Sequence, residues 1–248
     1  MKLDCTIKDF GHCPVPENWV VDMTHRINRL YYIHSGKGGY QKDGKNIPLQ
    51  AGRIYFIPYT ADASFYSEQS DPLVHTWCDF QLTAPIVSRN ILSFVAEEAI
   101  DKAALAVFLE GGQIEETRWK GGSAIAEEEN FQALFIRAVL FLSARAAELA
   151  GVVPVKDVAI TRALEVMHAG IADKVSVKSL ADGSFLSEGG FIRKFTREVG
   201  MTPYAYLKTL RVKTALSLKE QGYTLDDIAT RTGYADASSL LHSLRSRN

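Results

Sequence analysis

The chain has 248 residues, 46% of them hydrophobic, which suits one large domain or two modest ones and excludes global disorder. No stretch approaches the roughly 18 consecutive apolar residues that span a bilayer, so we expect a soluble, cytoplasmic protein without membrane contact. The net charge of -1 conceals an asymmetry: residues 153–248 hold 14 Lys and Arg against 10 Asp and Glu, whereas residues 1–152 hold 14 against 19. A basic C-terminal part suits contact with phosphates.

The three cysteines are Cys5, Cys13 and Cys78, an odd number without CxxC spacing. This pattern favours neither a disulfide framework nor a thiolate zinc site, and it predicts reduced thiols in or near a core. No convincing catalytic grouping occurs in the sequence either, because the pairs that could be assembled lack the context of a catalytic motif. We therefore expect no enzymatic activity, no catalytic residue and no cofactor.

Residues 26–82 are rich in Tyr, Ile, Phe and Val and are interrupted by turn signals. Within residues 39–49, Asp43-Gly44 readily supplies the positive φ of a tight turn, which predicts a hairpin. In the segment 74–80 the alternation places His75 and Trp77 on one face of a strand. Short strands at this spacing predict a β-sandwich or barrel.

After Pro85 the sequence becomes rich in Ala, Leu and Glu, and apolar residues recur at helical spacing over residues 86–110 and 127–149. We predict two long helices there, beside the β region. Residues 151–154, Gly-Val-Val-Pro, are the best candidate for a linker, and the pattern beyond them is helical in short pieces. These features predict an N-terminal domain of residues 1–150 and a C-terminal domain of residues 155–248.

A weak internal repeat lies in the C-terminal part. The matching pairs are Leu180-Ala181 with Ile228-Ala229 at an offset of 48, and Phe191 and Phe195 with Leu240 and Leu244 at 49. Two copies of one structural unit would explain the repeat. Each unit would consist of a short helix, a tight turn and a second helix. The predicted helix caps are Ser176, Ser187, Thr224 and Asp236, with Gly233 in the second turn. Such a unit can present its second helix to the major groove.

A longer string at regular spacing is more specific. It comprises Leu186 through Phe195, Gly200-Met201-Thr202-Pro203, Tyr206-Leu207, Leu210-Arg211-Val212, Ala215-Leu216, Ile228-Ala229 and Gly233-Tyr234-Ala235-Asp236. This string resembles the AraC/XylS family of transcription regulators. The resemblance implies a ligand-responsive, sequence-specific DNA-binding protein of α+β class. Its expected parts are a cupin-like β jelly roll with two flanking long helices, and an all-α domain with two helix-turn-helix units joined by a helix over residues 203–219.

By the same resemblance, the base-reading positions of the first recognition helix are Gly189, Ile192 and Arg193. Arg193 has the bidentate donor geometry for guanine, and Ile192 could pack on a thymine methyl. The alternative for Arg193 is an ordinary solvated surface charge. The residues interpreted as phosphate contacts are Lys194, Thr196 and Arg197.

In the second unit the equivalent positions are Ser238, Ser239 and His242, whose short or titratable side chains predict weaker readout. An ordinary surface histidine is the alternative for His242. Arg211 and Ala215 match family positions that are mostly architectural, so we predict structural roles for both.

Several departures from the family pattern bear on DNA affinity. Gly189-Gly190 lies inside the first recognition helix and costs roughly 1 kcal/mol per glycine relative to alanine. Phe185 stands where the family usually has a turn glycine, Ser239-Leu240 replaces a usual aromatic pair, and the sequence stops at Asn248 before the family's final helix. These departures motivate a second hypothesis: a ligand-binding or interaction module of the same family, with weakened or lost DNA binding.

Residues 26–80 resemble the sugar-sensing domain of the same family. The residues that carry this resemblance are Ser35-Gly36-Lys37-Gly38, Leu49 with Ala51-Gly52, Tyr55-Phe56-Ile57-Pro58 and Trp77-Cys78-Asp79-Phe80. The resemblance places ligand-facing positions on Phe65 and Trp77 and a ligand-contacting arginine on Arg26, and His75 shares the face of Trp77. Ordinary core rings and a structural histidine are the alternatives. A site lined by aromatic rings suits a carbohydrate or a similar small polar molecule.

A metal-dependent cupin enzyme is the rival to a sensor, and it would need three histidines and a carboxylate. The corresponding positions, in residues 38–41, at Lys45 and at Ala63, hold none of them, so we expect no metal site. The family resemblance implies as partners double-stranded DNA, a small-molecule effector, a second copy of the chain through the two long helices and, for an activator, RNA polymerase.

Overall fold

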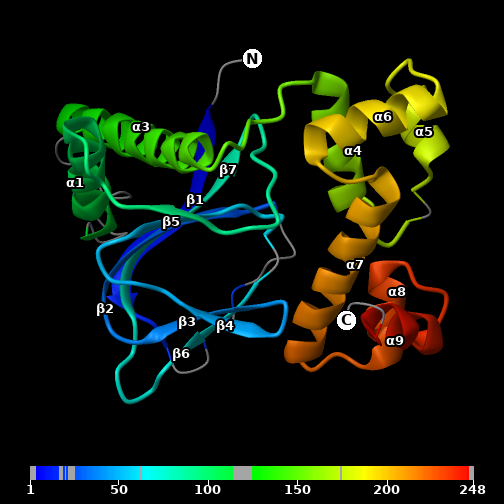
Figure 1. Ribbon diagram of the computed structural model, residues 1–248, viewed down its shortest axis with the longest axis horizontal. Coiled ribbons are helices and arrows are strands. Elements are labelled where there is room, and N and C mark those ends of the chain that lie inside the picture. The colour runs from blue at the N-terminus through cyan, green and yellow to red at the C-terminus, as the bar shows by residue number, and fades with distance from the viewer. Residues whose placement is uncertain are drawn as a thin grey trace. The chain divides into compact units, whose positions relative to one another are not determined.

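The computed structural model describes residues 4–16, 19, 21, 26–61, 63–113, 125–173 and 175–245. The chain divides into two compact units. Unit 1 comprises Met1–Val21 and Ile27–Pro154, and unit 2 comprises Asp22–Arg26 and Val155–Asn248. The described part of unit 1 contains two antiparallel sheets and two helices, and that of unit 2 contains helices, so the protein is of α+β class (Figure 1).

Two antiparallel sheets form the centre of unit 1. The five-stranded sheet has the order β1 (Cys5–Pro14), β7 (Val74–Leu82), β2 (Asn28–Ser35), β5 (Ile54–Ile57) and β8 (Leu92–Phe94). The three-stranded sheet has the order β4 (Lys45–Pro48), β3 (Gly38–Lys42) and β6 (Ser64–Ser67). Tyr31 of β2 lies opposite both Trp77 of β7 and Tyr55 of β5, so these three side chains share one face of the larger sheet.

The predicted hairpin is confirmed. β3 and β4 pair in register from Gly39 opposite Pro48 to Lys42 opposite Lys45. Asp43 and Gly44 make the turn with φ values of 48° and 72°. Positive φ at both central residues is the geometry of a type I′ turn, whose twist matches that of the flanking strands.

One face of the five-stranded sheet carries the core of unit 1. Leu30, Phe56 and Phe80 are fully buried there and pack with Phe108 of α1 (Ala99–Gln113) and Phe135 of α3 (Ile125–Leu149). Figure 1 shows both helices on this side of the larger sheet and the three-stranded sheet on its other side. The opposite face of the larger sheet is therefore directed towards the smaller sheet, and we call it the inner face.

The prediction of one helix over residues 86–110 is wrong in its first half. Leu92 and Phe94 are buried while Ser93 is exposed, and these residues pair with β5 as strand β8. The helix begins only at Ala99. A strand of three residues shows too little alternation to be distinguished from helical spacing. The second predicted helix is confirmed as α3. None of the helices that the structure describes combines the length and apolar content needed to cross a membrane.

Six helices follow in the described part of unit 2. They are α4 (Val158–Ala169), α5 (Val177–Asp182), α6 (Glu188–Val199), α7 (Pro203–Glu220), α8 (Leu225–Thr232) and α9 (Ala237–Arg245). All four predicted caps are confirmed, since Ser176, Ser187 and Thr224 accept N–H groups at the starts of α5, α6 and α8. Asp236 accepts from the Ser239 N–H at 2.7 Å before α9. Each helix start is thus specified by its own sequence.

The internal repeat corresponds to two similar helix pairs, α5 with α6 and α8 with α9. Phe191 and Phe195 are fully buried on α6. In the second pair, Ile228, Ala229 and Leu240 form a buried cluster with Ala215 of α7. The spacing that repeats in the sequence is therefore the spacing of the residues that pack each helix pair.

Candidate DNA-binding and ligand-binding sites

Helix α6 carries the three residues predicted to read bases in the first helix pair. It starts at the Ser187 cap, whose hydroxyl accepts the Gly190 N–H at 3.2 Å, and it buries its phenylalanines on the opposite face. Gly189 and Arg193 are exposed, and Ile192 is half buried. A Cβ at Gly189 would lie 3.6 Å from Arg193 Nη1, so the guanidinium extends over the glycine. Gly189 and Arg193 are therefore neighbours on the outer surface of α6.

The three residues predicted to contact phosphates lie in different environments. Lys194 forms an ion pair with Asp157, the residue that caps α4. The Thr196 hydroxyl is buried, which places it out of reach of a phosphate. Arg197 is exposed and pairs with the adjacent Glu198 at 3.2 Å. Arg197 is more exposed than Lys194, with 70% of its side chain accessible against 31%.

The turn between α5 and α6 has an unusual residue. Phe185 adopts a φ of 53°, and its side chain is 99% exposed. A left-handed backbone is uncommon for a residue with a large side chain and costs about 1–2 kcal/mol. The turn geometry of the helix pair is therefore retained at Phe185 with local backbone strain.

Helix α9 carries the corresponding residues of the second pair. Ser238, Ser239 and His242 are exposed, and they line a groove of about 600 Å³ together with residues of α7, including Lys208. This groove was not predicted, because the pairing of α7 with α9 depends on tertiary packing.

Arg211 of α7 has the structural role that its family position suggests. Its Nε donates to the Ile171 carbonyl at 3.0 Å and its Nη2 to the Asp173 carbonyl at 2.8 Å. Ala215, one turn further along the helix, is buried against α8 and α9. Both residues hold helices of unit 2 together.

Aromatic rings from both sheets of unit 1 meet on the inner face of the larger sheet. Phe65 of β6 lies opposite Tyr40 of β3, and its ring centroid is 5.0 Å from that of Trp19. Trp19 also lies 6.0 Å from Tyr31 and 5.8 Å from His75, and the last two rings are 4.9 Å apart. We call Trp19, Tyr31, Phe65 and His75 the ring cluster. Two of its members, Phe65 and His75, were predicted to bind ligand.

His75 is the polar member of the ring cluster. It is 4% exposed, and its Nδ1 forms no hydrogen bond of ordinary geometry with the described residues. Burial lowers the pKa of His75 to about 4, and a backbone interaction with Cys13 offsets only part of this shift. The imidazole is therefore neutral at pH 7.

A buried ion pair lies on the same face of the larger sheet. Arg29 Nε is 3.4 Å from Asp79 Oδ1, across neighbouring strands β2 and β7. Burial raises the pKa of Asp79 to about 6, against the opposing effect of Arg29 and with a further increase from Asp9. At pH 7 the charges of Arg29 and Asp79 largely neutralise each other.

The other two predicted ligand-binding residues are not members of the ring cluster, although Trp77 lies opposite Tyr31 on the same face of the larger sheet. Trp77 covers Gly11 of β1, where a Cβ would be 3.2 Å from the indole Nε1. Arg26 groups with unit 2, and its Nη1 lies 3.2 Å from Glu165 Oε1 of α4. Three of the four predicted residues, Phe65, His75 and Trp77, therefore lie in or beside the ring cluster. The cluster also contains Trp19 and Tyr31, which were not predicted.

Two further histidines, His12 and His34, lie on the helix-covered side of the larger sheet. His12 Nδ1 and His34 Nε2 both contact Thr76 Oγ1, at 3.1 and 2.9 Å. Burial and the neighbouring His12 lower the pKa of His34. In the part of the chain that the structure describes, no group of three or more His, Cys, Asp or Glu side chains is arranged to hold a metal ion.

Comparison with known proteins adds information on the C-terminal part. A family profile described as a helix-turn-helix domain matches residues 180–247, which span α8, α9 and most of the preceding helix pair. The uncharacterized HTH-type transcriptional regulator YbfI of Bacillus subtilis (strain 168) is 33% identical to this chain over 76 residues. That match covers 31% of this chain and 28% of YbfI, so it concerns only part of each protein.

Several solved structures have a similar arrangement of elements. ToxT from Vibrio cholerae O395 matches with a TM-score of 0.49 and 12% identity, covering 99% of this chain and 92% of that chain. Unsaturated fatty acid bound wild-type ToxT from Vibrio cholerae strain SCE256 scores 0.47 at 12% identity, with coverages of 99% and 90%. The AraC-like transcriptional activator CuxR scores 0.33 at 13% identity, with coverages of 82% and 71%. Likeness at this level does not extend to ligands or residue roles.

Proposed function

We propose that the protein is a one-component transcription regulator of the AraC/XylS type that binds DNA through unit 2 and a small molecule through unit 1. The match of residues 180–247 to a helix-turn-helix domain profile supports the DNA-binding part. The observation that carries the proposal is α6: a capped helix that buries Phe191 and Phe195 and presents Arg193 to solvent. An exposed arginine on such a helix has the bidentate geometry that reads guanine in the major groove.

The ring cluster of unit 1 supports a neutral polar ligand. Aromatic faces stack on the CH groups of a sugar, and a neutral imidazole such as that of His75 can exchange a hydrogen bond with a hydroxyl. Arg29 and Asp79 pair with each other, so the charges of these two residues largely offset one another. We therefore propose a carbohydrate or a molecule of similar polarity as the ligand. Ligand control then requires that the ligand bind two states of the protein with different affinity.

The two long helices of unit 1 support self-association. Ile100 on α1 and Leu134 on α3 are more than half exposed, although both belong to helices that bury other apolar residues in the core. Exposed apolar side chains on a helix pair are candidates for contact with a second copy, and two-fold dimers are the commonest oligomers. In this proposal, α1 and α3 form the dimer interface.

A second candidate function has its own support. Gly189, Gly190 and the strained Phe185 all weaken the first helix pair, which favours a ligand-binding module of the same family with reduced DNA affinity. This candidate predicts ligand-induced thermal stabilisation without sequence-selective DNA binding.

A gel-shift experiment with the full chain tests the main proposal. Overlapping duplexes that tile the DNA upstream of its gene are titrated, with a mixed-sequence duplex as reference. We expect one duplex to bind more tightly than the reference, and Arg193→Ala to reduce that preference by about 1–3 kcal/mol. Arg162→Ala, which removes an exposed arginine from α4, is the matched control and should change nothing. Equal binding of all duplexes by the wild type would support the second candidate.

A further inference from the structure

The turn between α5 and α6 is a Schellman motif with Phe185 at its left-handed position. The Leu186 N–H donates to the Ala181 carbonyl and the Phe185 N–H to the Asp182 carbonyl, each at 3.2 Å. This pair of hydrogen bonds closes the end of a helix and needs a left-handed backbone at the residue that Phe185 occupies. Phe185 adopts it with a φ of 53°, a conformation that glycine would adopt without strain. The motif therefore holds Phe185 in a defined backbone conformation.

The Phe185 ring adds no packing to the folded chain. Its side chain is 99% exposed, whereas Phe191 and Phe195 of α6 are fully buried. A phenyl ring is one of the largest apolar groups that a protein can bury, so a fully exposed one is a candidate for contact with another molecule. Strained backbone positions likewise cluster at sites that contact ligands. The strain and the exposure together indicate that Phe185 contacts a molecule outside the chain.

The place of Phe185 in the chain indicates the kind of molecule. Phe185 comes two residues before Ser187, the cap of α6, so the two Cα atoms lie within about 7 Å. The first turns of a recognition helix are the part that contacts base edges in the major groove. Gly189 and Arg193 are exposed on these turns. The ring is therefore next to the surface that the proposed function directs towards DNA, which favours DNA over a protein partner.

We propose that Phe185 contacts the 5-methyl group of a thymine in the major groove, beside the base pair that Arg193 reads. Apolar side chains distinguish thymine from the other bases through this methyl group. The backbone strain at Phe185 is then offset when DNA binds rather than when the chain folds. The inference rests on the proposed DNA-binding function and adds a specificity-determining residue in the turn to the base-reading residues of α6.

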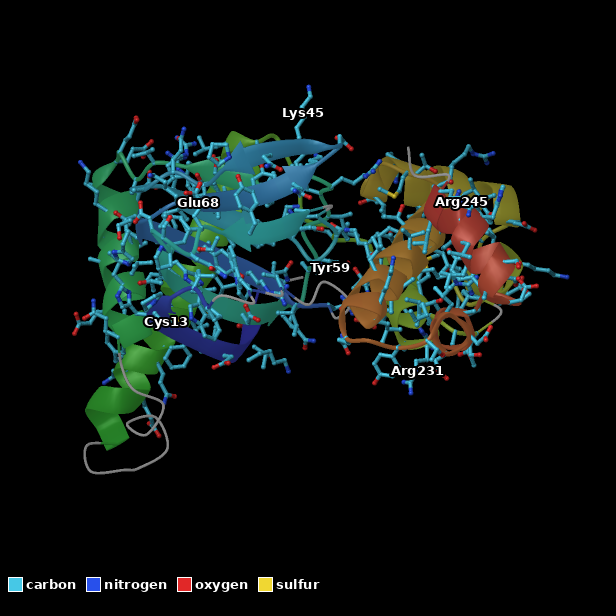
Figure 2. All side chains as sticks on the ribbon, turned by 90° about the horizontal axis from the view of Figure 1, so that it is seen from below. Cys13, Lys45, Tyr59, Glu68, Arg231 and Arg245 are labelled. Carbon is cyan, nitrogen blue, oxygen red and sulfur yellow. The ribbon has the colours of Figure 1, made fainter. Side chains whose placement is uncertain are left out.

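An uncharged ring suits a base better than a phosphate. Exposed cations such as Arg231 of α8 and Arg245 of α9, whose side chains project from the helices in Figure 2, are better suited to phosphates. Exposed carboxylates flank Phe185 in the sequence, at Asp182 and Glu188, and they disfavour a phosphate close to the ring. A contact with a thymine methyl group releases no counterion, so it should not change the salt dependence of binding.

Replacement of thymine by uracil tests the contact at the level of one methyl group. Fluorescence anisotropy measures binding of the full chain to the preferred upstream duplex and to duplexes in which one thymine at a time is replaced by uracil. We expect one replacement to weaken wild-type binding about three- to fivefold, the effect of one buried methyl group. Phe185→Ala should bind the thymine duplex about three- to tenfold more weakly and should not respond to that replacement. Its slope of log affinity against log salt should match that of the wild type.

Three further variants make the readout specific. Val158→Ala removes an exposed apolar side chain from α4 and should leave DNA affinity unchanged. Ile192→Ala removes the other candidate for a thymine contact and should leave the response to the uracil position assigned to Phe185 intact. Phe185→Gly should weaken binding as Phe185→Ala does but unfold at a higher temperature, because glycine relieves the strain. A loss of affinity in Phe185→Gly therefore cannot come from unfolding.

The outcomes separate the inference from the function on which it rests. If the wild type prefers one duplex but Phe185→Ala binds it as tightly, the inference is wrong and the proposed function stands. The inference is also wrong if no uracil replacement weakens binding, if Ile192→Ala rather than Phe185→Ala removes the response, or if Phe185→Ala makes the salt slope shallower. If the wild type prefers no duplex, the inference and the proposed function both fail. Altered self-association of Phe185→Ala on sedimentation, with unchanged DNA affinity, would assign the ring to a second copy of the chain.

Discussion

His75 and Asp79 lie on the same face of β7, and burial shifts their pKa values in opposite directions. The pKa of His75 falls from 6.5 to about 4, and that of Asp79 rises from 3.8 to about 6. Between pH 4 and 6.5 the folded protein binds fewer protons at His75 than the unfolded chain does, so this residue makes stability rise with pH. Asp79 binds more protons in the folded protein, so its contribution is present below pH 4 and is lost as pH rises through about 6. The two effects oppose each other in one pH window.

Single substitutions should separate these effects. Relative to the wild type, Asp79→Asn should give a free energy of unfolding that rises by about 3 kcal/mol between pH 4 and 6.5, because the His75 contribution is no longer opposed. For His75→Gln, the free energy of unfolding relative to the wild type should instead fall between pH 4 and 6.5, because the Asp79 contribution is no longer opposed. Urea unfolding at several pH values measures both. Parallel curves for the wild type and both variants would contradict the burial of these groups in the folded state.

The contact of α1 with α3 should tolerate no added carbon at Gly111. A Cβ there would lie 2.2 Å from Cδ2 of the fully buried Phe135 ring. Since neither the helix backbone nor the packed ring can move freely, Gly111→Ala should lower the free energy of unfolding by about 1–3 kcal/mol. Glu110→Ala, at the preceding exposed position, is the control and should stay within about 0.5 kcal/mol of the wild type. Equal melting temperatures for the two variants would show that the helices are further apart.

The two adjacent glycines of α6 should respond differently to alanine. At Gly189 the nearest neighbour of an added Cβ is the flexible Arg193 side chain at 3.6 Å, whereas at Gly190 it is the capping hydroxyl of Ser187 at 3.0 Å. Gly189→Ala should therefore stabilise the protein by about 0.5–1 kcal/mol, the usual gain within a helix. Gly190→Ala should gain less, because the cap must shift. Chemical denaturation compares them, and a larger gain at Gly190 would argue against the Ser187 cap.

Phe185 should be a site where a smaller residue improves stability. Phe185→Gly removes the cost of a left-handed backbone at φ 53°, and the lost side chain is 99% exposed, so no packing is lost. Glycine also makes the unfolded chain more flexible, which offsets part of this effect. The free energy of unfolding should therefore rise by about 0.5–1 kcal/mol. Thermal unfolding measures it. Phe185→Ala, which keeps the strain but loses the ring, should show no gain, and a gain equal to that of glycine would place the effect in the ring.

Local signals in the sequence predicted much of unit 2. Ser187, Thr224 and Asp236 mark helix starts because a short polar side chain before an apolar periodic segment is itself the physical cause of the cap. The turn at Asp43-Gly44 was predictable for the same reason, since few residues adopt positive φ. These features depend on residues that are close together in the chain.

The ring cluster was predicted only in part because it depends on contacts between residues that are distant in the sequence. Phe65 and His75 were found through family resemblance and strand alternation, whereas Trp19 lies outside the strands and gives no periodic signal. The pairing of Arg29 with Asp79 depends on the register of β2 against β7, which no local pattern fixes. Strand β8 was missed because its three residues are stabilised by pairing with β5 rather than by their own propensity.

The contacts of Arg211 limit how the two helix pairs of unit 2 can be exchanged during evolution. Its guanidinium donates to the carbonyls of Ile171 and Asp173 before α5, and a Cβ at Gly233, in the turn between α8 and α9, would lie 2.7 Å from its Nη2. The Arg211 side chain on α7 therefore packs against the segment before α5 and against the turn between α8 and α9. A recombinant that takes one helix pair from a relative must also bring a turn and a loop that accept this arginine, so the two pairs are exchanged most easily as a single block.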